Sequence, residues 1–192
     1  MKKLFLAFLG AAASVCMGAD DYFNGGFEVC APDTSGVAMP VGWVSNRAVT
    51  RNGKARLIRE SGCFRSGSFG LLAETEAKGS LSFRSLKSIG ITQGDTLELE
   101  IYAKGSGKYS LQYIVYGVED EKHHKFLTTL GTGRGKQATE ETWQHYTAKI
   151  KFTPPPKARG KYEKYTVIPV IFVHGDAEII FDDFKLKITP KK

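Results

Sequence analysis

The chain has 192 residues and a formal net charge of +7 at pH 7. That length suits one domain with a sizeable core, and a second domain is not expected. The positive charge is spread over loops such as 121–125 and 157–164, and no helix with a basic stripe is predicted. Nucleic-acid binding is therefore not expected, whereas adhesion to an acidic surface stays open.

The first 19 residues have the pattern of a secretory signal peptide. Two lysines precede an apolar run too short to span a bilayer, and small residues follow where a signal peptidase cuts. Cleavage after Gly18 or Ala19 leaves one domain over residues 20–192. Cys16 raises the alternative of a lipoprotein, but Val15 stands where a lipobox has a small residue. We expect an exported protein, located in the periplasm, at the cell surface or outside the cell.

Two cysteines follow the leader, Cys30 and Cys63. An oxidising compartment favours a disulfide between them, which would anchor the N-terminal segment to the rest of the domain. The alternative is two free or buried thiols, because the sequence does not give the distance between their Cα atoms.

The rest of the chain predicts short strands. Apolar and polar residues alternate in 97–103, 146–152 and 178–188, as in half-buried strands. Segments 109–116 and 166–173 are apolar on both faces, so each sheet face is at least partly covered there. Glycine and proline turn signals separate the strands, at 90–95, 104–108, 131–136 and 153–161. Because no segment has a helical period over a dozen residues, the pattern predicts an antiparallel sandwich or barrel.

Short motifs along the chain resemble those of one group of domains. They are NGGFE at 24–28, PVGW at 40–43, SGSFGLLAE at 66–74, YAKG at 102–105, Trp143 with Tyr146, and IIFDDFKLKI at 179–188. In this order they resemble the carbohydrate-binding modules of the galactose-binding-like jelly-roll type. That group includes xylan- and β-glucan-binding modules attached to bacterial glycoside hydrolases. The resemblance implies an all-β jelly roll, an antiparallel two-sheet β-sandwich, often with a structural calcium ion where the first and last strands meet.

Each end of the domain carries an acid that needs a partner. Glu28 closes the NGGFE turn where the chain is about to be buried. The strand period places Asp182 on the inward face of the last strand, together with Ile180 and Phe184. A buried carboxylate is costly unless it is paired or bound to a metal. Two carboxylates with backbone carbonyls form an all-oxygen set, which suits calcium.

We therefore expect a structural calcium ion bound by the side chains of Glu28 and Asp182. Backbone carbonyls of the turn from Asn24 to Gly26, and of the loop from Ser66 to Ser68, are the expected further ligands. The alternative is that both acids accept backbone amides or pair with an arginine such as Arg65.

Tyr102, Gln112 and Tyr116 are the expected sugar-binding residues. Aromatic rings stack on sugar rings, and polar side chains bind their hydroxyls. The resemblance implies a shallow cleft on a concave sheet face, and these residues form it if they share that face. The alternatives are that outward tyrosines pair across strands for stability, or that Tyr162 and Tyr165 form a site at a loop end.

No catalytic group is apparent in the sequence, so we do not expect an enzyme. General acid–base catalysis of glycoside hydrolysis needs two carboxylates across a cleft, and the acids expected to be buried are assigned to calcium. Adjacent His123 and His124 predict a solvated loop, and GTGRGK lacks the Ser or Thr of a phosphate loop. The expected function is an exported, non-catalytic glycan- or polysaccharide-binding module with a structural calcium. The alternative is an exported β-sandwich that mediates protein contacts or assembly and binds no sugar.

Overall fold

The computed structural model describes residues 22–32, 36–46, 49–120, 124–131, 136–138 and 141–191. The expected signal peptide, with Cys16, and His123 lie outside the described residues. Within the described ranges, no helix is long and apolar enough to cross a membrane.

The described chain is built from strands, and every strand pair is antiparallel. A 3-10 turn, η2 (Pro156–Ala158), lies in the proline-rich loop. The strands are β1 (Cys30–Pro32), β2 (Ala38–Pro40), β3 (Trp43–Ser45), β4 (Arg51–Ile58), β5 (Gly70–Ser85), β6 (Ile89–Ile91), β7 (Thr96–Val118), β8 (His124–Gly131), β9 (Lys136–Ala138), β10 (Gln144–Lys151) and β11 (Lys164–Thr189). β1 and β2 pair only with each other, and the other strands form one sheet. The predicted all-β antiparallel fold is confirmed.

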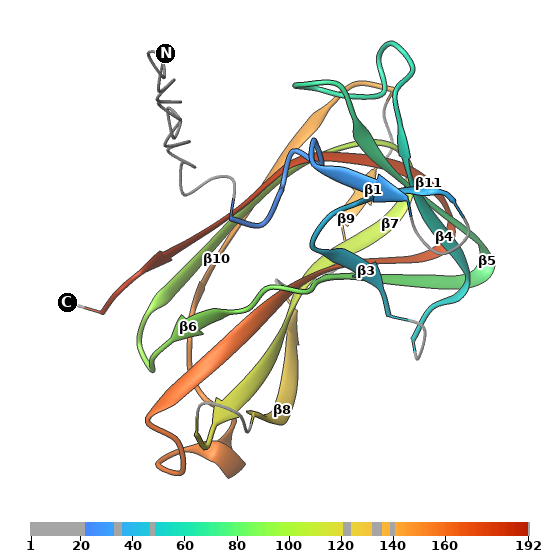
Figure 1. Ribbon diagram of the computed structural model, residues 1–192. Coiled ribbons are helices and arrows are strands. Elements are labelled where there is room, and N and C mark those ends of the chain that lie inside the picture. The colour runs from blue at the N-terminus through green and yellow to red at the C-terminus, as the bar shows by residue number, and fades with distance from the viewer. Residues whose placement is uncertain are drawn as a thin grey trace, which may run out of the picture.

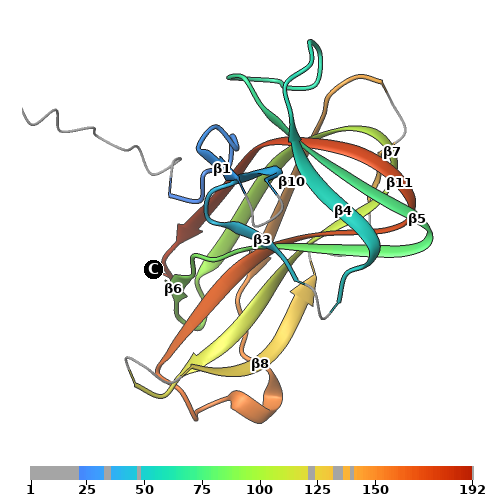
Figure 2. The ribbon, with the colours of Figure 1, turned by 45° about the vertical axis from the view of Figure 1, so that its right-hand side comes forward.

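The sandwich arises because three long strands bend and run through both of its layers. β11 pairs with β5 and β7 on both sides of the bend. Figure 1 shows the three strands turning together at the right of the view, and Figure 2 shows the turn from a second side. In β11 the register shifts between His174 and Ala177. In β7 the bend falls at Gly105 and Gly107, whose φ angles of 118° and 127° favour glycine.

We call the two halves of this sheet the first and second layers. The first layer contains β10, residues 53–58 of β4, and residues 70–75, 96–104 and 177–189 of the long strands, whereas Arg51 of β4 pairs with Ser80 of the second layer. The second layer contains β3, β6, β8, β9 and residues 80–85, 108–118 and 164–174. Rings of the two layers meet in the core: the centroids of Tyr109 and Phe181 are 5.2 Å apart, as are those of Trp43 and Phe184. The two predicted sheets are thus the halves of one bent sheet.

Alternation along β7 places one face of the strand in the core on both sides of the bend. Every second residue is buried, first Leu97, Leu99, Ile101 and Ala103, then Tyr109, Leu111, Tyr113 and Val115. The residues between them point away from the core, because successive side chains of a strand lie on opposite faces. This outward set includes Tyr102, Gln112 and Tyr116.

The last strand corrects one expectation about its inward face. Ile179 and Phe181 are buried before Asp182, and Phe184 is buried after it, whereas Ile180 is half-buried. The cause is a register shift between Asp182 and Lys185, where Asp183 has a φ of 50°. The prediction that Ile180 shares a face with Phe184 is wrong because this bulge changes the parity of the strand.

Candidate functional site

Asp182 is buried, as predicted, and its carboxylate accepts three backbone amides. Oδ2 accepts the amide of Arg65 at 2.7 Å and that of Ser66 at 3.0 Å, and Oδ1 accepts the amide of Asp183 at 2.7 Å. Burial raises the pKa of Asp182, while these amides act in the opposite direction. The carboxylate therefore joins the bulge of β11 to the loop that precedes β5.

Glu28 reaches the same loop, but from the surface. Its Oε1 accepts the amides of Ser68 at 2.9 Å and Phe69 at 3.1 Å. The expectation that Glu28 is a buried acid is wrong: the residue is exposed, and its carboxylate caps the loop from outside. A Cβ on Gly67, which has a φ of 66°, would lie 2.2 Å from Oε1, so only glycine leaves room for the carboxylate.

Asn24 and Phe27 give the NGGFE turn its shape, with φ angles of 50° and 58°. The Asn24 side chain donates to the carbonyls of Val29 at 2.7 Å and Val41 at 3.0 Å, and it accepts the amide of Val29 at 3.0 Å. Phe27 is fully buried. The turn thereby directs Phe27 into the core and Glu28 towards the loop at 65–69.

Arg65 pairs with a third acid, Asp183, and also covers Tyr102. Its guanidinium carbon lies 3.7 Å from the centre of the Tyr102 ring, and the hydrogen bond to Asp183 raises the pKa of Arg65. The Ser66 hydroxyl donates to Asp183 Oδ1 at 2.7 Å. The His145 ring also stacks on Tyr102, with centroids 4.4 Å apart and an interplanar angle of 16°. We call Glu28, residues 65–69, Asp182 and Asp183 the clasp.

The clasp offers the oxygen ligands that calcium prefers, but many of these oxygens already accept hydrogen bonds. The alternative given above, that both acids accept backbone amides, describes the observed contacts of Glu28 and Asp182. The expected carbonyl ligands are also partly engaged, since those of Asn24 and Gly25 accept amides of Phe27 and Phe184 at 3.0 Å each. Across the described part of the chain, no three acidic, histidine or cysteine side chains come together as a metal site. The donor chemistry fits calcium, and the calcium ion stays a prediction.

The two cysteines do not form the predicted disulfide. Both are free: Cys30 is exposed in β1, and Cys63 is half-buried in the loop before β5. Each is fixed by its own neighbours, because Cys30 pairs in register with Pro40, and the carbonyl of Cys63 packs against Gly70. The observed state is the alternative of free thiols: an oxidising compartment favours a disulfide only where the two chain segments meet, and the sequence did not give that distance.

The three expected sugar-binding residues are not brought together. Gln112 and Tyr116 lie four residues apart on the outward face of the second layer. Tyr102 is separated from them by the bend of β7 and lies on the outward face of the first layer, opposite His145. The expected single cleft with all three residues does not form, because the segment at 104–108 bends the strand from one layer into the other and so separates Tyr102 from Gln112 and Tyr116.

Phe126 completes an aromatic pair that the sequence analysis missed. It lies opposite Tyr116 on the neighbouring strand, with ring centroids 6.0 Å apart and an interplanar angle of 73°. Phe126 is 58% exposed, and Tyr116 is half-buried. Its segment, His124–Gly131, was not predicted as a strand because charged and polar residues surround it. An outward ring pair can stack on a sugar ring, and the Gln112 amide, four residues along the same face from Tyr116, can bind hydroxyls of a longer glycan chain.

The alternative loop-end site contains Tyr162 and Tyr165, and both rings are used in packing. A Cβ on Gly117 would lie 2.7 Å from three atoms of the Tyr162 ring, so this ring lies flat on Gly117. Tyr165 is buried, and its hydroxyl donates to the carbonyl of Ala158 at 3.2 Å. A cavity of about 720 Å³ lies beside Tyr162, with lysines and acids around it.

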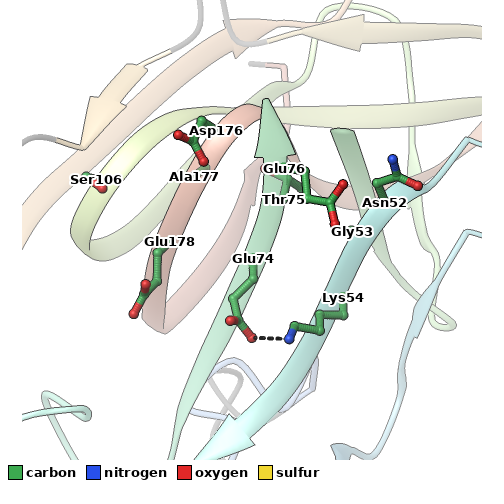
Figure 3. Close-up of a pocket in the computed structure, with 10 residues that line it drawn as sticks. All are labelled: Asn52, Gly53, Lys54, Glu74, Thr75, Glu76, Ser106, Asp176, Ala177 and Glu178. Carbon is green, nitrogen blue, oxygen red and sulfur yellow. Dashed lines mark ion pairs between the residues drawn. The ribbon is translucent and has the colours of Figure 1, made fainter. Parts of the chain in front are cut away.

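A second cavity, of about 620 Å³, lies at the bend (Figure 3). Side chains of β4, β5 and β11 line it, and Glu74 pairs with Lys54 at 3.5 Å. Its other acids are Glu76, Asp176 and Glu178, all exposed. None of the described residues that line it is aromatic, so it offers hydrogen-bonding groups but no ring for a sugar to stack on.

Comparison with solved structures supports the fold. A xylan-binding domain, CBM22-1 of Xyn10C from Paenibacillus barcinonensis, has a TM-score of 0.50 and 14% identity, covering 88% of this chain and 94% of that domain. The enzymatically active domain of tailspike protein 4 of bacteriophage CBA120 also has a TM-score of 0.50, with 10% identity, covering 78% of this chain. This chain spans only 20% of that tailspike chain.

A CBM4 structure has 18% identity and a TM-score of 0.46, with coverage of 86% and 98%. No protein-family model matches the sequence, and no curated protein is significantly similar to it. The likeness to the xylan-binding domain supports an antiparallel jelly-roll sandwich of the kind found in carbohydrate-binding modules, and at 14% identity it shows the fold alone.

Proposed function

We propose that the domain is a non-catalytic carbohydrate-binding module that holds a polysaccharide against the outward face of the second layer. The observation that carries the proposal is the aromatic pair of Tyr116 and Phe126, on the same outward face as Gln112. A half-buried and a mostly exposed ring on neighbouring strands offer a platform for sugar stacking. The fold shared with a xylan-binding domain agrees with this use of the sandwich.

A glycan array with the folded domain, residues 20–192, tests the proposal. We expect binding to at least one polysaccharide, and we expect Tyr116→Ala and Phe126→Ala each to weaken it about ten-fold, the equivalent of roughly 1.4 kcal/mol. Leu86→Ala is the matched control, because Leu86 is 61% exposed and lies outside the aromatic pair. Absence of binding on a broad array would refute the function, and unchanged binding by both aromatic variants would refute the site.

Tyr102 needs its own variant because it lies on the other layer. Under the proposal, Tyr102→Ala lowers stability through the lost contacts with Arg65 and His145, and it leaves glycan affinity within about two-fold. Affinity is measured by titration calorimetry below the unfolding temperature of the variant. A loss comparable to that of Tyr116→Ala would show that the first layer also binds glycan.

The proposal includes a structural calcium ion at the clasp. Three carboxylates, those of Glu28, Asp182 and Asp183, meet one loop, and a single guanidinium, that of Arg65, opposes them. This surplus of negative charge supports cation binding. Calorimetry and thermal unfolding of chelator-treated protein test it: heat of binding and a raised Tm, both lost in Glu28→Gln, are expected on adding calcium. If adding calcium gives no heat of binding and no change in Tm, the proposed calcium ion is wrong, and the hydrogen bonds of the clasp hold it together without a metal.

The proposal also includes export, which is motivated by the signal-peptide pattern of residues 1–19. We expect protein recovered from outside the cytoplasm to begin at Ala19 or Asp20. Mass spectrometry of the intact protein gives the cleavage site, and an uncleaved cytoplasmic product would contradict the proposal.

A protein-contact function is the second candidate, and one observation favours it. Val29 and Val41 are 55% and 46% exposed, and the amide of Val41 donates to the carbonyl of Val29 at 2.8 Å. Adjacent exposed valines are typical of a contact surface when they belong to a larger patch. Sedimentation analysis of the wild type and a Val29→Ser, Val41→Ser variant tests it, and a monomer in both cases argues against self-association there.

A further inference from the structure

From the charge distribution we infer that the outward face of the second layer selects an anionic polysaccharide, one that carries carboxylate or sulfate groups. The inference rests on the proposed glycan-binding function and names the class of glycan. Its basis is a difference in charge between the two layers of the sandwich.

The strand segments of the second layer contain no acidic residue where the structure describes them. These segments are 43–45, 80–85, 89–91, 108–118, 124–131, 136–138 and 164–174. The first layer is different, because its strand segments contain Glu74, Glu98, Glu100, Glu178, Asp182 and Asp183. Glu119 and Glu163 lie just outside the strands of the second layer, after the end of β7 and before the start of β11. They line the cavity beside Tyr162.

Lys54, Arg56 and Lys149 of the first layer lie within ion-pair distance of its acids. In the first layer Lys149 pairs with Glu98 at 3.0 Å, and Lys54 and Arg56 lie 3.5 and 3.7 Å from Glu74. In the second layer Arg84 and Lys108 form no ion pair with any described residue. Arg84 is half-buried and has no ion pair with a described residue. The electrostatic attraction between such a guanidinium and an incoming anion is stronger than that of a fully solvated guanidinium.

Arg84 stands in the same row of the sheet as Gln112. Val170 lies between them, in register with both, so the two polar side chains are two strands or about 10 Å apart. Tyr116 lies four residues along the strand from Gln112, about 13 Å away. A guanidinium binds a carboxylate or sulfate with two parallel hydrogen bonds, which suits Arg84 to the charged group of a glycan whose ring stacks on Tyr116.

Two further cations lie towards the bend on the same face. Lys108 and Arg51 belong to one row, with His174 and Ser80 between them. Arg51, like Lys108, is exposed and has no ion pair with a described residue. Repeated cations along one face fit a polymer with repeated negative charges better than a neutral chain or a single small anion.

Two matched pairs of probes test the inference. The first is oligogalacturonate and its methyl ester, and the second is dextran sulfate and dextran, so only the charge differs within a pair. At low ionic strength we expect at least one charged probe to bind about ten-fold or more tightly than its neutral partner. Tighter binding of oligogalacturonate than of its methyl ester identifies carboxylate as the recognised group. Tighter binding of dextran sulfate than of dextran identifies sulfate. The preference should decrease as salt rises to about 0.15 M.

Variants localise the effect. Arg84→Gln should remove most of the preference for the charged probe, and Arg84→Lys should retain part of it. Lys187→Gln makes the same charge change on the outward side of the first layer, and it should leave the preference within two-fold of the wild type. Thermal unfolding confirms that each variant is folded. Equal losses in Arg84→Gln and Lys187→Gln would overturn the inference, because net charge alone would explain them. So would duplex DNA binding as tightly as the charged glycan.

The outcomes separate this inference from the proposed function. Equal affinity within both probe pairs, with binding lost in Tyr116→Ala, overturns the selection of anionic glycans and leaves glycan binding intact. Failure to bind these probes and every glycan of the array overturns both.

Discussion

Gly25 lies against the last strand so closely that a single methyl group has no room. Its carbonyl accepts the amide of Phe184 at 3.0 Å, and a Cβ would lie 1.7 Å from the Phe184 carbonyl oxygen. We expect Gly25→Ala to lower the free energy of unfolding by about 3 kcal/mol or to prevent folding, because backbone on both sides must move. Urea unfolding at pH 7 measures the effect.

Gly26→Ala is the control for Gly25→Ala. A Cβ there meets only the Glu28 side chain at 3.7 Å and Asp183 Oδ1 at 4.0 Å, which are ordinary contacts. Its free energy of unfolding should stay within about 1 kcal/mol of the wild type. Similar losses in both variants would contradict the close approach of Gly25 to Phe184.

The Tyr113 hydroxyl is buried without a hydrogen-bond partner among the described residues. Burial raises the pKa of Tyr113 far above its ordinary value. We expect Tyr113→Phe to leave stability unchanged or to raise it by up to about 1 kcal/mol, because a buried donor without a partner is removed. Tyr165→Phe is the comparison, since its hydroxyl donates to Ala158, and it should cost about 1 kcal/mol. A larger loss in Tyr113→Phe would indicate a bound water at that hydroxyl.

At the residue scale, sequence reasoning identified Asp182 as a buried acid but not its partners. A carboxylate on an inward strand position requires a partner, so the anomaly is visible in the sequence. Two of its three amide partners belong to a loop more than a hundred residues earlier, and no local pattern specifies them. Arg84 was overlooked for the same reason, because only the pairing of strands shows that no acid in the described ranges forms an ion pair with it.

At the scale of elements, the bend of the three long strands depends on Gly105. Its φ is 118°, and a Cβ would lie 2.2 Å from the carbonyl oxygen of Glu178. We expect Gly105→Ala to cost about 3 kcal/mol, because the strained φ and the overlap both oppose the side chain. Thermal unfolding by circular dichroism measures it.

Gly90→Ala serves as the control for the bend, because nothing lies within 4 Å of a Cβ at that position in β6. Its Tm should stay within a few degrees of the wild type. If Gly105→Ala were equally mild, the bend would tolerate an ordinary residue, and the role given to Gly105 would be wrong.

Strand identity was predictable for β7 and β11, but their lengths were not. Alternation in 97–103 and in 178–188 indicated strands because one face of each meets the core. The segment KGSGK at 104–108 was interpreted as a turn that ends one strand and begins another. It is the bend within a single strand, because the long strands keep their pairing on both sides of it.

At the scale of the whole molecule, Asp95 joins the end of the domain to the turn before β7. Its Oδ1 accepts the amide of Lys191 at 2.9 Å, and its Oδ2 accepts the amide and hydroxyl of Thr92 at 2.8 and 2.9 Å. The amides of Thr92 and Lys191 lower the pKa of Asp95 below its ordinary value of 3.8. Because the pKa is lower in the folded state, the carboxylate adds stability above pH 3.8, and this part is lost as pH falls through the folded pKa.

Asp95→Asn should therefore cost about 1–3 kcal/mol at pH 7, and the difference from the wild type should shrink as pH falls below about 4. Urea unfolding at a series of pH values measures this difference. The pH dependence distinguishes the contribution of Asp95 from that of Asp182, because burial raises the pKa of Asp182 whereas the pKa of Asp95 is lowered. Asp176→Asn, which changes an exposed acid at the bend, is the control, and a loss that does not depend on pH would contradict the role of Asp95.

The amino-acid sequence alone was sufficient to predict the fold class and the core-facing residues of regular segments such as 97–103. Those properties follow from the period of apolar residues and from glycine and proline turns. Both are local features that can be recognised without knowing which strands pair. The tertiary structure was needed to show that Tyr102 is separated from Tyr116, that Phe126 lies opposite Tyr116, and that Arg84 forms no ion pair with a described residue. These facts depend on which strands are neighbours and where the long strands bend, and both are set by contacts between distant parts of the chain.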